Sequence, residues 1–271
     1  MKLAILDLYD GTPNQGMRCI KDMVARYEGD LEDWKVFDVR GKNEVPDLSY
    51  DIFISTGGPG NPLEGDGVWD KNYYNWLDSV WSWNQKNPED KKHVFFICHS
   101  FQMMVNHFNL AKITKRYSKS FGTFPVHKAA KGIDDPLFKE LPEPFYIADF
   151  RDFQAVEANE ERFTEIGAKI IALEKYRPHV ALERAIMGIR LSDEIVGVQF
   201  HPEADPDGML LHFSSKKQEQ HIKENYGVEK YDDMIEHLND EDKINLTHDT
   251  ILPTFLENAI KTIVAAKSVM A

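Results

Sequence analysis

The sequence predicts an α/β protein: a mostly parallel sheet with helices on both faces, an added antiparallel β section and a C-terminal helical extension. Three observations lead to this fold class. Up to about residue 112, short apolar runs alternate with stretches of helical spacing, which is typical of parallel sheets covered by helices. Closely spaced β-like segments follow as far as residue 203, and charged sequence with helical spacing begins at Asp205.

The first part of the chain supplies the expected parallel strands and their helices. The runs DIFIS and HVFFIC are continuously apolar, as expected of strands that are buried on both faces. Between the strands, apolar residues recur at helical spacing. The expected strands are 2–9, 34–40, 51–55 and 93–98, and the expected helices are 16–27, 69–81 and one that begins near 101.

The later part of the chain changes character twice. Turn residues separate five β-like segments, so we expect antiparallel pairing and a last strand that returns to the sheet: 121–129, 145–158, 168–176, 179–186 and 194–203. Helical spacing then recurs in 207–227, 229–240 and 250–267. We therefore predict one domain over residues 1–204 and a helical extension, 205–271, packed on the same domain.

The composition limits the function classes. The chain has 271 residues and a formal net charge of −13, so it lacks the basic surface that nucleic acid or an anionic membrane requires. No run of about 20 apolar residues offers a membrane-spanning helix. The two cysteines, Cys19 and Cys98, give no disulfide framework and favour a reducing compartment. We predict a cytoplasmic protein without a metal or cofactor.

The motif FFICHSFQ, residues 95–102, places Cys98 where a buried strand ends. Ligands of parallel α/β sheets bind at the carboxyl ends of the strands. A nucleophile on the tight turn into the next helix is exposed at this edge, and the helix N-terminus favours a thiolate. Cys98 is therefore a candidate nucleophile, and a buried structural cysteine is the alternative.

Two further motifs favour the nucleophile. GVQFHPE, residues 197–203, places His201 and Glu203 on the same side of an extended segment. In this arrangement a carboxylate can orient an imidazole while the imidazole acts on a cysteine. STGGPGNP, residues 55–62, follows a strand, and its glycines let backbone N–H groups approach a ligand closely.

In order and spacing, these motifs resemble the class I glutamine amidotransferases, the Cys-His-Glu triad family, over about residues 1–204. The sequence looks most similar to free-standing relatives of the amidotransferase domain of GMP synthetase. TGGPGNP and GVQFHPE match the family pattern closely, and the elbow matches at Cys98 and Gln102. The resemblance implies a triad of Cys98, His201 and Glu203, an oxyanion hole from the N–H groups of Gly58 and His99, and Gln102 in the substrate pocket.

The resemblance also implies a reaction. Cys98 attacks the side-chain amide of glutamine, His201 acts as base and then as acid, and Glu203 orients His201. Water then releases glutamate from the thioester, and the ammonia passes to an acceptor in a synthetase domain or subunit. The sequence leaves the identity of this acceptor and the oligomeric state open.

The elbow departs from the family pattern at two glycines. Phe96 stands two residues before the cysteine and Ser100 two residues after it. The bulky ring of Phe96 needs a neighbouring space, which we expect between the elbow and an adjacent helix. The imidazole of His99 is expected to point to solvent, and tuning of the Cys98 thiolate is the alternative.

A second departure lies in ADFRDFQ, residues 148–154, where many family members carry a Ser-His-Gly-Asp-like stretch. Asp149, Arg151 and Asp152 stand there instead. Asp149 and Asp152 are candidates for binding the amino and carboxylate groups of the substrate. The alternative is a solvated loop.

Two other functions fit the same motifs. One is a hydrolase of γ-glutamyl peptides or conjugates, with the same chemistry at Cys98. The other is a non-catalytic binding or regulatory protein, for which Phe96 is the best support. The extension is expected to form a cap near the active-site mouth, which restricts bulky substrates or docks a synthetase, or else a structural tail without such a role.

Overall fold

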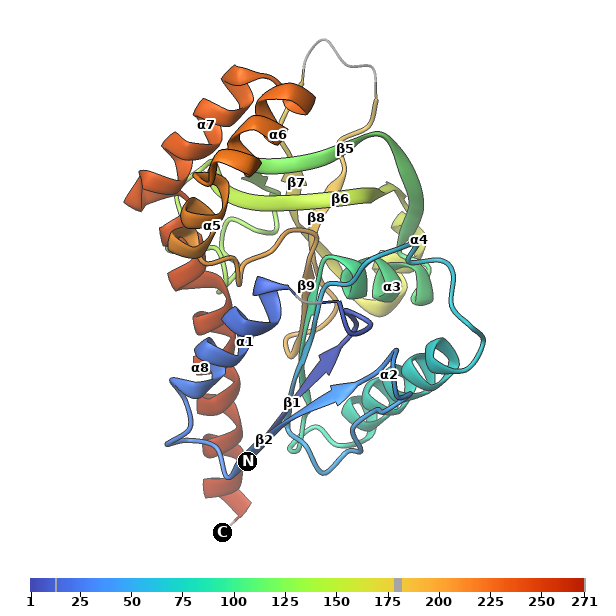
Figure 1. Cartoon of the computed structure of the whole chain (residues 1–271). Coiled ribbons are helices and arrows are strands. Elements are labelled where there is room, and N and C mark those ends of the chain that lie inside the picture. The colour runs from blue at the N-terminus through green and yellow to red at the C-terminus, as the bar shows by residue number, and fades with distance from the viewer. Residues whose placement is uncertain (13, 178–181, 271) are drawn as a thin grey trace.

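The computed structural model describes residues 1–12, 14–177 and 182–270 (Figure 1). Five strands form a parallel half-sheet in the order β2-β1-β3-β4-β9. Their short apolar sequences match the predicted runs, since β3 and β4 are buried at every position. The strands are β1 (Lys2–Asp7), β2 (Asp33–Asp38), β3 (Ile52–Ser55), β4 (His93–Ile97) and β9 (Ile195–Val198).

The other half of the sheet is antiparallel and continues from β9 in the order β8-β6-β5-β7. These strands are β5 (Ala111–Lys128), β6 (Phe145–Ala158), β7 (Lys169–Glu174) and β8 (Ile186–Arg190). Four pairings between the described strands are parallel and five are antiparallel, so the prediction of a mostly parallel sheet is wrong. The β-like segments extend the parallel sheet at its β9 edge, and this makes one mixed sheet.

The strand expected over 179–186 also differs from the structure. Residues 182–185 lie outside any strand, and β8 begins at Ile186, where a fully buried apolar run starts. Residues 179–181 of the predicted strand lie outside the described residues. Beyond β6, the helix α4 (Glu160–Ile166) precedes β7.

Helices cover both faces of the parallel half, as Figure 1 shows. On one face, α2 (Trp69–Lys86) and α3 (His99–His107) enclose a core that includes Phe53 and Phe96. On the other face lie α1 (Gln15–Ala25) and α8 (Leu246–Met270). Because successive side chains of a strand point to opposite faces of the sheet, neighbouring residues of each strand pack into these two separate cores.

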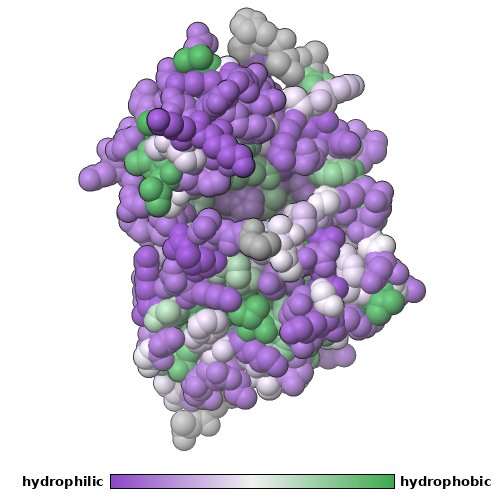
Figure 2. Space-filling view, in the orientation of Figure 1, coloured by the Kyte–Doolittle hydropathy of each residue, from purple (hydrophilic) through white to green (hydrophobic). Residues whose placement is uncertain are grey.

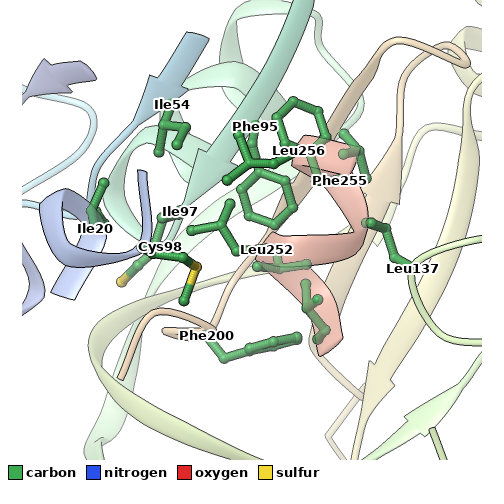
Figure 3. Close-up of a cluster of buried hydrophobic side chains, with 14 of the residues drawn as sticks. Ile20, Ile54, Phe95, Ile97, Cys98, Leu137, Phe200, Leu252, Phe255 and Leu256 are labelled. Carbon is green, nitrogen blue, oxygen red and sulfur yellow. The ribbon is translucent and has the colours of Figure 1, made fainter. Parts of the chain in front are cut away.

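The long helix α8 packs directly behind the strand that ends at Cys98. Figure 3 shows Phe95 and Ile97 of β4 pointing towards the α8 side chains, and the rings of Phe95 and Phe255 are 5.1 Å apart. Leu252 and Leu256 of α8 are fully buried in the same core. Helix α8 therefore packs against the strand that leads to Cys98.

The remaining helices of the extension lie over β5 and β6. They are α5 (Pro206–Phe213), α6 (Lys216–Tyr226) and α7 (Val228–Asn239), and a kinked turn, η1 (Glu241–Asn245), joins them to α8. We call α5–α7 the cap. The cap has a small apolar core of its own, which contacts Phe121, Tyr146 and Phe150 of the two strands.

The structure corrects one prediction about the extension and leaves another untested. The run predicted over 207–227 is two helices, because the backbone of Ser215 is extended and begins a second helix after α5 ends at Phe213. The division of the chain into a domain ending at 204 and an extension stays a prediction.

Within the described residues, no helix has both the length and the apolar character that crossing a bilayer requires.

Candidate active site

Cys98 occupies the turn between β4 and α3. Its backbone φ is 48°, a left-handed conformation that few residues other than glycine adopt. The thiol is almost buried, at 6% exposure, and lines a cavity at the carboxyl edge of the parallel strands. A strained residue at this edge of an α/β sheet is typical of a nucleophile elbow.

His201 and Glu203 lie beside Cys98. Nδ1 of His201 is 2.8 Å from Oε1 of Glu203, and Cys98 lines the same cavity as these two residues. Burial lowers the pKa of His201, but the charges of Glu203 and Cys98 raise it more, so the net pKa lies well above the usual value. With Nδ1 directed to Glu203, Nε2 is the imidazole atom free to act on the thiol.

The turn after β3 packs tightly beneath the imidazole. A Cβ on Gly57 would lie 2.9 Å from Cε1 of His201, and one on Gly58 would lie 2.5 Å from the carbonyl oxygen of Leu8. Only glycine fits at these two positions, because real Cβ atoms do not approach other heavy atoms so closely. Arg40 holds the same turn, donating from Nη1 to the carbonyl oxygen of Pro59 at 2.7 Å.

Two backbone N–H groups are available near the thiol. Gly58 lines the cavity with Cys98, and His99 follows Cys98 at the first position of α3. Within the described part of the chain, neither N–H donates a hydrogen bond to another protein group. Free donors beside a nucleophile are the elements of an oxyanion hole.

Gln102 supports the site indirectly. Its Nε2 donates to Oε1 of Gln199 at 3.0 Å, and Nε2 of Gln199 lies 3.8 Å from the Cys98 sulfur. Gln102 is buried and is not among the residues that line the Cys98 cavity. Gln199 was not predicted as a site residue, although it stands within the GVQFHPE motif.

The cavity lined by Cys98, His201 and Glu203 has a volume of about 710 Å³. Figure 2 shows this face of the molecule hollowed beneath the cap, with hydrophobic residues visible in the recess. Three phenylalanine rings form an apolar wall: Phe121 lies 5.2 Å from Phe150 and 6.0 Å from Phe213, and Phe150 lies 6.2 Å from the His201 ring. Phe213 and Met209 come from α5, so the cap supplies part of the wall.

Residues of the N-terminal segment, among them Tyr9, Gly16 and Cys19, line the same cavity and were not predicted. Tyr9 and Gly16 lie against Glu203, since a Cβ on Gly16 would lie 2.6 Å from the Tyr9 hydroxyl and 3.0 Å from Oε1 of Glu203. Cys19 also lines the cavity, and burial raises the pKa of its thiol. No motif signals these residues, because only the fold brings the N-terminal segment and α1 to Cys98, His201 and Glu203.

The structure corrects the expectation for His99. Its imidazole is buried, at 2% exposure, instead of pointing to solvent. Burial, together with the charge of Arg40, lowers its pKa to about 3, so the ring is neutral at physiological pH. His99 therefore places no positive charge beside the thiol.

Phe96 and Ser100, which replace the two glycines of the family pattern, are both accommodated by neighbouring residues. Phe96 pairs with Gly197 of β9, where a Cβ would lie 3.0 Å from Cβ of Phe96. The space for the ring thus comes from a glycine on the neighbouring strand, and the ring packs in the core under α2 and α3. The Ser100 hydroxyl accepts from the Ile97 N–H at 3.0 Å and donates to the Ser55 carbonyl at 2.7 Å.

Asp149 and Asp152 lie outside the Cys98 cavity. Asp149 is buried, accepts from Nε of Arg151 at 2.9 Å and accepts from the Ser120 hydroxyl at 2.6 Å. The Asp152 carboxylate is half exposed and lies 3.8 Å from Nζ of Lys119. These contacts do not support the prediction that the two carboxylates bind substrate. Among the described residues, no group of three His, Cys, Asp or Glu side chains is placed to hold a metal ion.

Comparisons with known proteins agree with the geometry. Residues 17–209 match the family model described as glutamine amidotransferase class-I. The fold is similar to a glutamine amidotransferase from Thermotoga maritima (TM-score 0.63, 16% identity, covering 96% of this chain and 97% of that one). It is also similar to a glutamine amido transferase from Methylobacillus flagellatus (0.64, 12%, 97% and 94%). A putative GMP synthase subunit from Thermoplasma acidophilum matches less closely (0.52, 13%, 100% and 97%). A search of curated proteins gave no match.

Proposed function

Because the chain belongs to the class I glutamine amidotransferase family, we propose that it cleaves the side-chain amide of glutamine through a thioester at Cys98. The single observation that carries the proposal is that Cys98 lines one cavity with the hydrogen-bonded pair of His201 and Glu203. The products are glutamate and ammonia.

The first half of the reaction forms the thioester. The raised pKa of His201 favours the pair in which Nε2 holds the proton of the Cys98 thiol, and the thiolate sulfur then attacks the amide carbon. The N–H groups of Gly58 and His99 donate to the oxyanion, and donors of this kind contribute about 3–4 kcal/mol each to barrier lowering. His201 then protonates the departing nitrogen, and ammonia leaves.

The second half releases glutamate. His201 takes a proton from water, the resulting hydroxide attacks the thioester carbon, and the Cys98 sulfur leaves and regains a proton. The Glu203 carboxylate keeps the imidazole in one tautomer and stabilises its protonated form in both halves. Gln102 acts by holding Gln199, whose amide lies near the Cys98 sulfur.

A glutaminase assay on the purified chain tests the proposal. Cys98→Ala should abolish ammonia release, and a glutamine-mimicking alkylator should label Cys98. Cys19 is a matched control in the same cavity, because its raised thiol pKa makes it a poorer nucleophile. Undiminished turnover in Cys98→Ala, or labelling of Cys19 alone, contradicts the proposal.

The proposed roles of His201 and Glu203 can be distinguished by measuring kcat of a variant at each residue. His201→Ala removes the base, whereas Glu203→Gln removes only its orienting charge, so kcat should fall further in the first variant. Wild-type activity in Glu203→Gln would favour a Cys-His dyad over the triad.

The ammonia acceptor is proposed to be carried by a separate synthetase. A putative GMP synthase subunit is among the similar structures, which supports this kind of partner without naming the acceptor. The described part of the chain is occupied by the amidotransferase fold and the cap. Co-purification of an ATP-dependent ligase that stimulates ammonia release would support the proposal, and channelling should vanish when that protein is removed.

A second candidate substrate is favoured by the wall of the cavity. Ammonia is the smallest leaving group and needs no apolar wall, yet Phe121, Phe150 and Phe213 form one beside His201. A volume of about 710 Å³ is in the range of cavities that hold drug-sized ligands. These features favour a γ-glutamyl conjugate whose amine is apolar, cleaved by the same chemistry.

Parallel assays distinguish the two substrates. Hydrolysis of a γ-glutamyl anilide should exceed that of glutamine in kcat/KM if the wall binds the leaving group. Equal or lower kcat/KM for the anilide would reject this second candidate and leave the glutaminase proposal intact. The non-catalytic alternative loses its support at Phe96, since Gly197 provides space for that ring.

A further inference from the structure

A second, smaller cavity lies behind the β5–β6 pair. Its volume is about 160 Å³, and its wall contains four cationic side chains but only two carboxylates. The cationic residues are Arg116, Lys119, Lys175 and Arg177, and the carboxylates are Asp149 and Glu174. In a chain with a net charge of −13, this concentration of positive charge is local and requires an explanation.

Both carboxylates in the wall are already engaged by arginines. Glu174 accepts three guanidinium groups: Arg116 at 3.2 Å, Arg151 at 3.3 Å and Arg177 at 2.7 Å. Arg151 also pairs with Asp149 at 2.9 Å. Arg116 also donates to Oε1 of Gln154 at 2.7 Å, and Arg151 to the Phe153 carbonyl at 3.4 Å. Among the described residues, the three guanidinium groups still carry more positive charge than the two carboxylates balance.

Two lysines add to this excess. Nζ of Lys175 lies 5.1 Å, and Nζ of Lys230 lies 3.6 Å, from the centre of the Phe124 ring in the cavity wall. Among the described residues, neither lysine forms an ion pair with a carboxylate at 4.0 Å or less. Burial and the charge of Lys175 lower the pKa of Lys230 to about 8, although Asp233 and Asp149 partly offset this.

The crowding also affects an arginine of the wall. Burial and the neighbouring charge of Arg151 lower the pKa of Arg116. Asp152 lies 3.8 Å from Lys119 and balances only that lysine. A bound anion would relieve the repulsion between these cations, and charge-assisted hydrogen bonds are strongest to oxyanions.

We propose that this cavity binds a phosphate group, either as inorganic phosphate or as the terminal phosphate of a small metabolite. The forked guanidinium of arginine matches the oxygen geometry of phosphate, and several converging cations suit a dianion. The volume is below the roughly 300–1,000 Å³ of cavities for drug-sized ligands, so it accommodates the phosphate group and leaves any attached body outside.

This second site is separate from the catalytic cavity. Ser120 and Asp149 line the phosphate cavity, whereas their neighbours Phe121 and Phe150 line the cavity with Cys98. Successive side chains of a strand point to opposite faces, so the two ligands lie on opposite sides of β5 and β6. The strands remain connected to the triad, because the N–H of His201 donates to the Ala148 carbonyl of β6 at 2.9 Å.

Isothermal titration calorimetry with inorganic phosphate tests the proposal, with chloride at equal ionic strength as the reference. Lys175→Gln should weaken phosphate binding by about tenfold, which is the loss expected for one charge-assisted contact. Lys261→Gln makes the same charge change at an exposed position of α8 and should leave binding unchanged. Absence of saturable binding by wild type, or equal loss in both variants, overturns the proposal.

Two additional measurements complete the test. Protein alkylated at Cys98 should still bind phosphate, and loss of binding on alkylation would place the anion in the catalytic cavity and refute a second site. Titration with a sugar phosphate identifies the source, since tighter binding than inorganic phosphate indicates the terminal phosphate of a metabolite, and weaker binding indicates the free ion. Failure of the glutaminase assay would leave these binding results unaffected.

Discussion

The two parts of the helical extension differ in what they pack against. Helix α8 places Ile251, Leu252 and Leu256 at 0% exposure in the main core, directly behind β4. The cap, α5–α7, instead forms a small cluster around Met234 and Ile222 on the outer side of β5 and β6. Figure 1 shows α8 running along the sheet beside α1, with the cap near the far end of β5 and β6.

Because of this difference, α8 contributes mainly to the stability of the fold, whereas the cap lies where it can contact a substrate. Side chains of α8 complete the core beneath Cys98 but are absent from the cavity wall, whereas Met209 and Phe213 of the cap line it. A boundary drawn at residue 204 from the motifs alone would therefore divide one hydrophobic core. The extension contains one part that the fold requires and one part that shapes the cavity.

Truncation after Asn245 should have the largest effect. It removes α8 and uncovers the core face of β4, which is fully buried in the intact chain. Several buried side chains at about 2–5 kcal/mol each exceed the roughly 5–15 kcal/mol of a typical folded domain. The truncated chain should be insoluble or unfolded by circular dichroism, and a cooperative melt at the wild-type temperature would contradict this role of α8.

A matched pair of substitutions sharpens the contrast. Leu252→Ala in α8 should destabilise the whole molecule by about 2–5 kcal/mol, the range for large-to-small changes in a core. Met234→Ala in the cap should act mainly on a smaller cooperative unit. Hydrogen exchange measures this: protection should fall throughout the sheet in the first variant and only in α5–α7 in the second. Equal loss across the sheet in both would show that the cap is not a separate unit.

Acid should affect the main domain and the cap through different histidines, His99 of α3 and His237 of α7. The folded pKa of His99, about 3, lies below the unfolded value of about 6.5, so the unfolded state binds more protons between these pH values. Its stabilising contribution is present above about pH 6.5 and is lost as pH falls, by up to about 1.4 kcal/mol per pH unit. His99→Gln should flatten the decline in melting temperature below pH 6.5.

His237 of the cap provides the comparison. Burial and the charge of Lys243 lower its pKa, and its Nδ1 lies 2.8 Å from the Thr123 hydroxyl. Acid should therefore loosen the cap as well, with the same sign. Hydrogen exchange of α7 in His237→Gln should become less dependent on pH, while the global melt keeps its wild-type decline. A changed global decline in this variant would mean that the cap unfolds with the core.

The most local effect on activity is expected at Phe213. This ring belongs to both the cap core and the cavity wall, so Phe213→Ala should lower kcat/KM for an apolar γ-glutamyl conjugate by about tenfold, or about 1.4 kcal/mol. Glutamine turnover should change little. Equal losses on both substrates would show that the ring supports the triad and does not select the leaving group.

The motifs predicted the chemical elements of the site because each is contiguous in sequence. Cys98 ends an apolar strand, Gly58 follows another, and His201 and Glu203 are two residues apart. The carboxyl ends of parallel strands meet at one edge, so these local patterns suffice to bring the groups together. The same reasoning failed for the sheet as a whole, because strand direction beyond β9 depends on hairpin pairing between segments 111–190.

The sequence by itself determined the order of strands and helices in the first hundred residues, the strained elbow and the residues of the candidate triad. Only the tertiary structure decided that His99 is buried, that Asp149 pairs with Arg151, and that α8 closes the core. The physical reason is the distance along the sequence over which each signal acts. Periodicity and motif spacing determine the direction in which a side chain leaves its own helix or strand. Burial, charge pairing and the space left by a glycine such as Gly197 depend instead on which residues of distant segments pack against that side chain.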